Sequence, residues 1–185
     1  PGGFGSRGIE GIISAIKFVR ENKIPYFGLC YGMQLMVIEY ARNVADIPDA
    51  HTAEIKPDAK NTVIDYMPEQ KEKMARGDFG GTMRLGGYPC KLSHGTIAKE
   101  AYGDANEVRE RHRHRYEVSP NALIKLTEAG LKFSGTSPDH SLMEIAELPR
   151  EVHPFMLGTQ FHPEFLSRPL SGHPLFLAFI KACIK

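Results

Sequence analysis

The sequence has few cysteines and lacks any long hydrophobic stretch. Its 185 residues include Cys30, Cys90 and Cys183, an odd number at wide spacing. Such a set does not form a disulfide framework and fits a reducing cytoplasm. No apolar run approaches the roughly 20 residues that cross a bilayer, and no signal-peptide pattern is present. We therefore expect a cytoplasmic protein with no membrane partner.

An excess of charge of either sign is also lacking. The sequence has 23 basic and 22 acidic residues, which leaves partner choice to local clusters of charge. The most basic stretch, residues 109–115, alternates arginine with histidine but also contains Glu110. We expect no nucleic acid partner, and two nearby histidines alone are a weak metal site. Two interpretations stay open: a solvated strand, or an arginine that binds a substrate carboxylate.

The spacing of apolar residues predicts an α/β fold. Helical spacing over residues 9–16 is followed by an apolar run at 24–29 and by helical spacing again at 33–44. Helix, strand, turn and helix in this order are typical of a parallel sheet. Further strands are expected at 113–118, 131–136, 142–148 and 155–161, helices after Pro120 and Pro174, and loops with short strands over 46–82. We expect three layers, with helices on both faces of a mostly parallel central sheet.

The chain opens on a glycine-rich loop, residues 1–5, with no methionine and no strand ahead of it. Because such loops usually join elements, we expect a piece of a longer chain whose preceding strands are missing. A processed N-terminus is the alternative. Gly3 to Gly8 also match the dinucleotide fingerprint G-x-G-x-x-G, but no strand precedes them and no acidic residue closes the next strand. We favour a backbone N–H donor here over a nucleotide site.

The central motif is Gly28-Leu29-Cys30-Tyr31-Gly32, a nucleophile flanked by glycines between a predicted strand and a predicted helix. This is the pattern of a nucleophile elbow, in which the turn is too tight for large flanking side chains. The helix N-terminus is expected to favour the thiolate, and the Tyr31 N–H to face an oxyanion. The alternative is an inert cysteine in a turn. Cys90 and Cys183 lack this context, and Cys183 is expected to pack in the core.

A thiolate nucleophile needs a proton carrier, and His162 is the preferred candidate among eight histidines. It follows a predicted strand, at the edge where α/β sheets place their sites. Glu164 lies two residues on, where its carboxylate can fix the imidazole tautomer.

These motifs resemble the class I glutamine amidotransferases, which share the elbow cysteine and a later His-Pro-Glu. The likeness is narrower to the CTP synthase family, and its motifs span nearly the whole chain: residues 1–8, 28–34, 80–86, 111–117, 160–165 and 167–169. The resemblance implies that residues 1–185 are a glutaminase domain, incomplete at its N-terminus and without the family's synthetase domain.

The resemblance also assigns roles to residues. Cys30, His162 and Glu164 would form the triad, and Gly3 and Tyr31 would supply oxyanion N–H groups. The glutamine site would be lined by Gly3, Phe4, Tyr31, Gln34, Glu54 and Arg115. Arg115 would meet the substrate's α-carboxylate and Glu54 its α-ammonium. Tyr31 stands where the family usually has leucine, and the neighbours of Glu54 differ from the usual ones.

The family's partners follow as expectations. Ammonia released from L-glutamine would aminate UTP to CTP in the synthetase domain, which uses ATP and Mg²⁺, whereas the glutaminase domain needs no cofactor or metal. GTP would be an allosteric activator, and the full-length enzyme a homotetramer. The alternatives are another class I amidotransferase, a γ-glutamyl hydrolase, or a non-catalytic amidase-like binding module.

Overall fold

The computed structural model describes residues 1–67 and 83–184. The helices are α1 (Ile9–Glu21), α2 (Tyr31–Asn43), α4 (Ile97–Ala101), α5 (Pro120–Glu128) and α6 (Pro174–Cys183), with a 3₁₀ turn η1 (Pro163–Phe165). The strands are β1 (Tyr26–Leu29), β2 (His51–Thr52), β3 (Thr62–Tyr66), β4 (Arg84–Leu92), β5 (Glu107–His114), β6 (Tyr116–Val118), β7 (Lys132–Thr136), β8 (Met143–Glu147) and β9 (Met156–Thr159).

The central sheet has six strands in the order β1-β9-β8-β7-β4-β5. Among these described strands only the β1–β9 pair is parallel, and the other four pairs are antiparallel. The expectation of a mostly parallel sheet is therefore wrong, although the α/β class is confirmed. The reason lies in the connections: β7, β8 and β9 follow one another through short loops, which join antiparallel neighbours, whereas β1 and β9 are distant in sequence.

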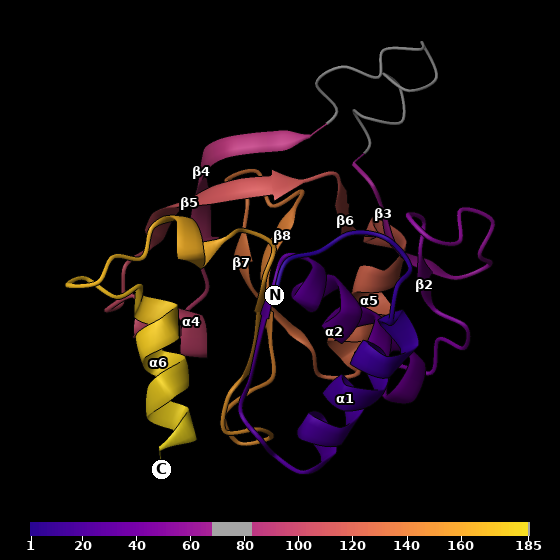
Figure 1. Cartoon of the computed structure of the whole chain (residues 1–185), viewed down its shortest axis with the longest axis horizontal. Helices are drawn as coiled ribbons and strands as arrows, with labels where there is room; N and C mark the ends of the chain where they lie inside the picture. The colour runs from indigo at the N-terminus through magenta and orange to yellow at the C-terminus, as the bar shows by residue number, and fades with distance from the viewer. Residues whose placement is uncertain (68–82, 185) are drawn as a thin grey trace.

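Helices cover both faces of this sheet (Figure 1). Helices α1, α2 and α5 lie on one side, where α2 packs against β1, β8 and β9. Helices α4 and α6 lie on the other and contact each other. Each side has its own apolar cluster, the first around Met33 and Ile38 of α2 and the second around Ile97 and Leu175. The expected three layers are present.

A second, three-stranded sheet of order β2-β3-β6 packs beside α2. Strand β6 follows β5 after one residue, Arg115, so the chain leaves the large sheet for the small one at that arginine. Glu54 comes two residues after β2. Of the expected glutamine-site residues, Arg115 therefore lies at the C-terminal end of β5, and Glu54 lies just after the first strand of the small sheet.

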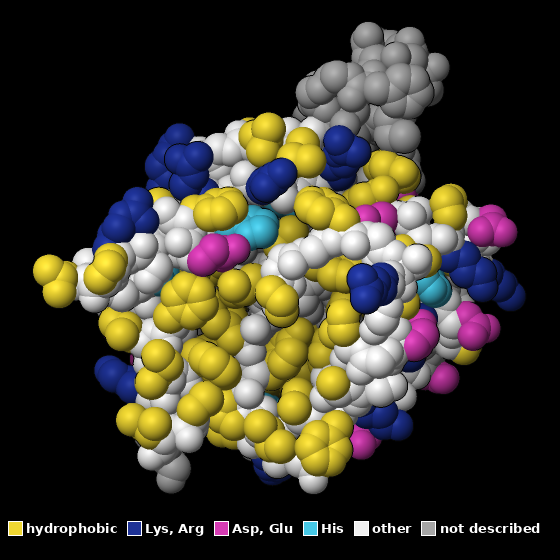
Figure 2. Space-filling view, viewed as in Figure 1, with side chains coloured by type: hydrophobic (Ala, Val, Ile, Leu, Met, Phe, Trp, Pro, Cys, Tyr) yellow, Lys and Arg dark blue, Asp and Glu magenta, His cyan; other side chains and the backbone are white. Residues whose placement is uncertain are grey.

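Most of the expected elements are present, with three differences. Strand β4, helix α4 and residues 107–112 of β5 were not expected, and the part of the Gly80–Gly86 motif up to residue 82 lies outside the described residues. Cys183 is exposed rather than packed in the core, because α6 leaves much of its apolar surface uncovered, including Leu177 and Ile180. Hydrophobic side chains gather accordingly over α6 and between it and α1 (Figure 2). No described helix is both long and apolar enough to cross a membrane.

Candidate active site

The elbow forms where β1 ends and α2 begins. Cys30 takes φ 51° and ψ −99°, a conformation that side-chain-bearing residues adopt at a cost of about 1–3 kcal/mol. The turn is closed tightly: a β-carbon added to Gly28 would lie 2.7 Å from the Gly32 carbonyl carbon and 2.8 Å from the Tyr26 hydroxyl oxygen. The two expected glycines thus allow the backbone to fold back on itself and present the thiol at the N-terminus of α2.

The Cys30 thiol lies in a buried, polar setting, with only 2% of the residue exposed. Its backbone N–H donates to the Thr159 carbonyl at 2.6 Å, and the Gln160 amide nitrogen lies 3.6 Å from the sulfur. Burial raises the pKa of the thiol to about 12, the Tyr31 N–H lowers it, and Glu117, Glu164 and Glu54 raise it. The expected preference for thiolate is therefore not met in the resting site, because desolvation outweighs the N–H donor.

His162 lies just beyond β9 and is held on three sides. Its Nδ1 bonds Glu164 Oε1 at 2.7 Å, its backbone N–H donates to the Arg111 carbonyl, and its ring stacks on Phe165 at 4.8 Å and 15°. The carboxylate selects the tautomer with hydrogen on Nδ1. Nε2 is buried and has no hydrogen-bond partner among the described residues, so it can accept a proton.

Gly2 lies close to both Cys30 and the imidazole of His162. A β-carbon built on Gly2 would lie 2.9 Å from His162 Cε1 and 3.9 Å from Cys30 Cβ. Residues far apart in the sequence therefore face the same point, with only a glycine backbone beside it. A cysteine, an imidazole and a carboxylate in this order can attack an acyl carbon and transfer a proton to its leaving group.

The glycine-rich loop closes over this point through Tyr31 and Glu54. The Tyr31 hydroxyl donates to the Gly5 carbonyl at 2.6 Å, and the Gly5 N–H donates to Glu54 Oε1 at 2.8 Å. A β-carbon on Gly3 would lie 3.2 Å from the Tyr31 ring. Residue 31 thus anchors the loop by a hydroxyl that leucine would lack. Phe4 is 56% exposed, on the outside of this loop.

Gln34 and Arg115 differ in placement. Gln34 is buried, and its amide nitrogen donates to the Tyr116 carbonyl and to Gln160 Oε1, both at 3.2 Å. Arg115 is exposed at the corner between β5 and β6. Burial and a hydrogen bond to Tyr66 raise the pKa of Tyr116, and among nearby charges Glu54 raises it and Arg115 lowers it. The two expected charged residues therefore lie near the same tyrosine.

A comparison with protein families shows which family the chain belongs to. The model of the family described as "Glutamine amidotransferase class-I" matches residues 1–182. The chain belongs to this family. The amidotransferase is 58% identical over 185 residues to a CTP synthase of Carboxydothermus hydrogenoformans, covering 100% of this chain and 34% of that protein. It is 57% identical over 184 residues to one of Leifsonia xyli, covering 100% and 32%. It spans about a third of the curated relatives it matches.

A solved structure places the match within CTP synthases. The Trypanosoma brucei CTPS glutaminase domain with bound acivicin superposes with a TM-score of 0.91 at 38% identity, over 100% of this chain and 69% of that one. A glutamine amidotransferase from Methylobacillus flagellatus shares the fold, with a TM-score of 0.52 at 15% identity over 86% of this chain and 46% of that one. The amidotransferase thus matches the glutaminase domain of CTP synthases.

Several residues around the site were not expected from the sequence. Gly2 lies beside His162 and Gln160 beside Cys30, yet neither carries a reactive group that would single it out. Their proximity to Gly3 and His162 in the motifs is the one signal that points to them. The alternative of a dinucleotide site at Gly3 to Gly8, which the sequence disfavours, gains no support, since Gly5 of this loop is bonded to Tyr31 and Glu54.

Behind the site lies a cluster of buried charged and imidazole groups. Arg84 Nη1 contacts Glu144 Oε1 at 2.7 Å, and His112 Nδ1 lies 2.9 Å from His114 Nε2. His114 Nδ1 in turn lies 3.3 Å from Glu117 Oε1. The arginine and histidine alternation of β5 thus places both histidines inside, while Arg109, Arg111 and Arg113 are exposed. Among the described residues, no group of three or more His, Cys, Asp or Glu side chains is arranged to hold a metal ion.

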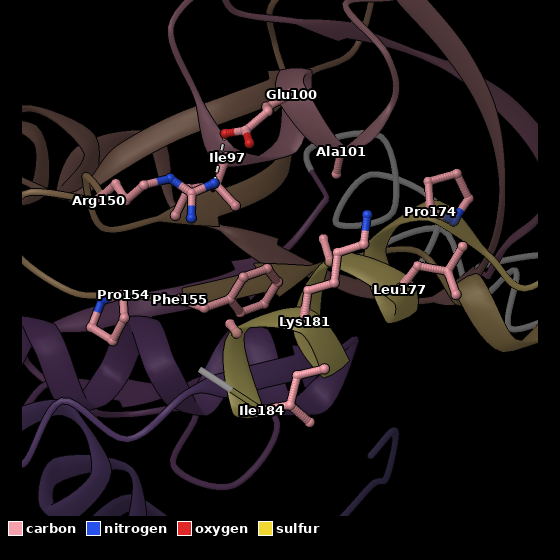
Figure 3. Close-up of a pocket in the computed structure, with 12 residues that line it drawn as sticks. Ile97, Glu100, Ala101, Arg150, Pro154, Phe155, Pro174, Leu177, Lys181 and Ile184 are labelled. Atoms are coloured by element: carbon pink, nitrogen blue, oxygen red, sulfur yellow. Dashed lines mark hydrogen bonds and ion pairs between the residues drawn. The ribbon is translucent and has the colours of Figure 1, made fainter.

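A cavity of about 840 Å³ lies elsewhere in the amidotransferase, between α4 and α6 (Figure 3). Phe155, Leu177 and Ile184 contribute apolar walls, and the charged side chains of Arg150 and Lys181 also line it. None of its lining residues belongs to the elbow or to the His162 turn, and none is a cysteine, serine or threonine. This cavity is therefore separate from the site formed by Cys30 and His162.

Proposed function

We propose that this chain hydrolyses the side-chain amide of L-glutamine, with Cys30 as nucleophile, and that it acts as the glutaminase domain of a CTP synthase. The observation that carries the proposal is the closeness of Cys30 and His162, because the Cys30 β-carbon and the His162 ring both lie beside Gly2. The hydrogen bond from His162 to Glu164 supports it, because it leaves Nε2 free to take the thiol proton.

The reaction divides into two halves. His162 takes the Cys30 proton as the sulfur attacks the amide carbon, which avoids a free thiolate in a buried site. The N–H groups of Gly3 and Tyr31 hold the oxyanion. The imidazolium then protonates the leaving nitrogen, which departs as ammonia and leaves a γ-glutamyl thioester. A water that gives its proton to His162 attacks the thioester, and the thiol leaves with that proton as glutamate is released.

Substrate binding would use the loop and the small sheet. Arg115 is assigned to the α-carboxylate and Glu54 to the α-ammonium, with Phe4, Gln34 and the Gly3–Tyr31 contact around the side chain. The Gly5–Glu54 hydrogen bond supports a role for Glu54 in shaping this pocket. The side-chain amide of Gln34 is buried and bonded to Tyr116 and Gln160. Gln34 would therefore shape the pocket through these two residues and not by touching the substrate.

The relatives extend the proposal to a longer protein. There, ammonia would pass to a synthetase domain that aminates UTP with ATP and Mg²⁺, GTP would activate glutamine hydrolysis, and the enzyme would be a homotetramer. The chain's 34% share of the Carboxydothermus relative leaves room for that domain in the relative.

Replacing the nucleophile tests the proposal. Cys30→Ala should lower the rate of ammonia release from glutamine by more than about 10³-fold, because the remaining groups cannot form the thioester. Cys183→Ser is the matched control, since that thiol is exposed on α6, and it should keep the wild-type rate. Glutamine hydrolysis at an unchanged rate in folded Cys30→Ala protein contradicts the assignment.

Covalent labelling separates an enzyme from a binding module. A glutamine-like electrophile should modify Cys30 alone, as mass spectrometry of proteolytic peptides would show. Absence of modification at Cys30 together with measurable glutamine binding would favour a non-catalytic module.

A further inference from the structure

We propose that Gln160 is a further catalytic residue, whose side-chain amide donates a hydrogen bond to the Cys30 sulfur and stabilises its negative charge during attack. This inference rests on the proposed function of Cys30. The Gln160 nitrogen Nε2 lies 3.6 Å from Cys30 Sγ, across 130 positions of sequence. Gln160 has no exposed surface, so its amide is committed to protein partners.

The backbone holds Gln160 at this place. Its N–H donates to the Glu144 carbonyl at 2.8 Å, and the preceding Thr159 carbonyl accepts the Cys30 N–H at 2.6 Å. The end of β9 therefore binds the main chain of the nucleophile through one residue and its sulfur through the next. These bonds fix the main chain from which the Gln160 side chain reaches the sulfur.

A second amide fixes which end of Gln160 faces the sulfur. Gln34 Nε2 donates both to the Tyr116 carbonyl and to Gln160 Oε1, each at 3.2 Å. A carbonyl oxygen can only accept, so the Gln34 nitrogen must face Tyr116. Its other hydrogen then meets the Gln160 oxygen, which turns the Gln160 NH₂ group toward Cys30. This relay orients a donor, and not an acceptor, at the sulfur.

The chemistry of the site needs such a donor. Burial and the carboxylates of Glu117, Glu164 and Glu54 disfavour a thiolate, and the Tyr31 N–H is the opposing group named so far. During the attack, however, the Tyr31 N–H is assigned to the oxyanion, so it is not left to stabilise the sulfur. A hydrogen bond to a charged acceptor is stronger than one to a neutral acceptor, so the Gln160 amide would stabilise the sulfur more as its proton leaves than in the resting thiol.

Thiol titration tests the proposal without relying on glutamine hydrolysis. Alkylation of Cys30 by iodoacetamide would be followed from pH 7 to 10 in a Cys183→Ser background, with the modified site located by mass spectrometry. Gln160→Met keeps the length and removes the donor. We expect alkylation at a fixed pH to slow by about ten- to a hundredfold, with the profile displaced to higher pH. Ser134→Ala is the control, because it removes another buried hydrogen bond, to Glu147.

Two outcomes overturn the proposal. One is a Gln160→Met profile that superposes on the wild type in protein whose circular dichroism is native. The other is an equal displacement in Ser134→Ala. If Gln160→Met does not fold, Gln34→Met replaces it: this variant leaves Gln160 in place, frees its oxygen, and should slow alkylation by a smaller factor. An unchanged Gln34→Met profile then contradicts the relay. Wild-type protein that titrates as proposed but releases no ammonia would instead refute the proposed function alone.

Discussion

Gly2 places bare backbone against the imidazole of His162. The residue is exposed, so ordinary packing does not demand a glycine there. The space toward the site does, because a methyl group would lie 2.9 Å from His162 Cε1, closer than non-bonded carbons approach. The requirement comes from the imidazole and not from the turn, since Gly2 does not have a positive φ.

We therefore expect Gly2→Ala to lower activity with little loss of stability. The methyl group should displace either the loop or the imidazole, and a misplacement near 1 Å can cost on the order of a hundredfold in rate. The measurement is kcat for glutamine hydrolysis beside the urea midpoint. Gly11→Ala is the control: a β-carbon there meets nothing within 4 Å, and alanine favours a helix. Equal kcat in both variants would show that the His162 contact is unimportant.

For single residues, the sequence indicated the reactive groups but not the residues that contact them. The roles proposed for Cys30 and His162 could be inferred because an elbow and a His-Pro-Glu turn have local patterns, and the structure brings the two residues together. Gln160 could not, since its contact with Cys30 depends on where β9 lies relative to α2. The raised pKa of Cys30 was also beyond reach, because burial is a property of the folded site.

At the scale of elements, two glycines in register set the distance between α2 and the sheet. Gly28 of β1 and Gly158 of β9 are paired in the parallel ladder. A β-carbon on Gly28 would meet the Gly32 backbone, and one on Gly158 would lie 2.8 Å from Met33 Cβ and 2.9 Å from Met33 Cα. The first turn of α2, which follows Cys30, therefore rests directly on strand backbone.

We expect Gly158→Ala to destabilise the protein by about 1–3 kcal/mol, the usual cost of overpacking a core. The neighbours include the α- and β-carbons of Met33, whose positions are fixed by the helix backbone, so α2 must shift and glutamine hydrolysis should fall as well. Gly87→Ala in β4 is the matched control, because its nearest neighbour at 3.0 Å is the Arg109 side chain, which can move. Urea unfolding measures both. A loss in Gly87→Ala as large as that in Gly158→Ala would contradict the backbone argument.

Elements with a clear period were predictable, and strand direction was not. Helices α1 and α2 follow from apolar spacing over several turns. Strand β4 contains Gly86, Gly87 and Pro89, residues that are uncommon in strands, so it was missed. Helix α4 has five residues, too few for a period. Pairing directions depend on which strands become neighbours, and among the described strands of the large sheet β1 with β9 alone fits the expected parallel arrangement.

For the whole molecule, the buried cluster behind the site links stability to pH. Burial and the charges of His114 and Arg84 lower the pKa of His112 from 6.5 to about 2, and burial and Arg84 lower that of His114 from 6.5 to about 3. The nearby carboxylates would favour imidazolium, but desolvation outweighs them. Burial also raises the pKa of Glu144 from 4.5 to about 7 and that of Glu117 well above 4.5.

These shifts act in opposite directions. Below pH 6.5 the unfolded chain binds protons on these histidines, whereas the folded protein does not. The contribution of the histidines to stability therefore falls as pH falls toward 3. The folded protein also keeps carboxyl protons that the unfolded chain releases above pH 4.5, so that contribution falls as pH rises toward 7. The two oppose each other between 4.5 and 6.5. As pH falls from 4.5 to 3, both carboxyl groups stay protonated in the folded protein and become protonated in the unfolded chain. In this range the pH dependence of stability therefore comes mainly from the histidines.

We therefore expect His114→Gln to flatten the acid side of the stability curve. Between about pH 3 and 4.5 the free energy of unfolding should depend on about one proton fewer than in the wild type, or ~1.4 kcal/mol less per pH unit. Urea unfolding at several pH values measures this slope, and the exposed His94→Gln variant controls for loss of a histidine. Parallel curves for His114→Gln and the wild type would mean that His114 accepts its proton in the fold, and that Glu117 pairs with an imidazolium under the active site.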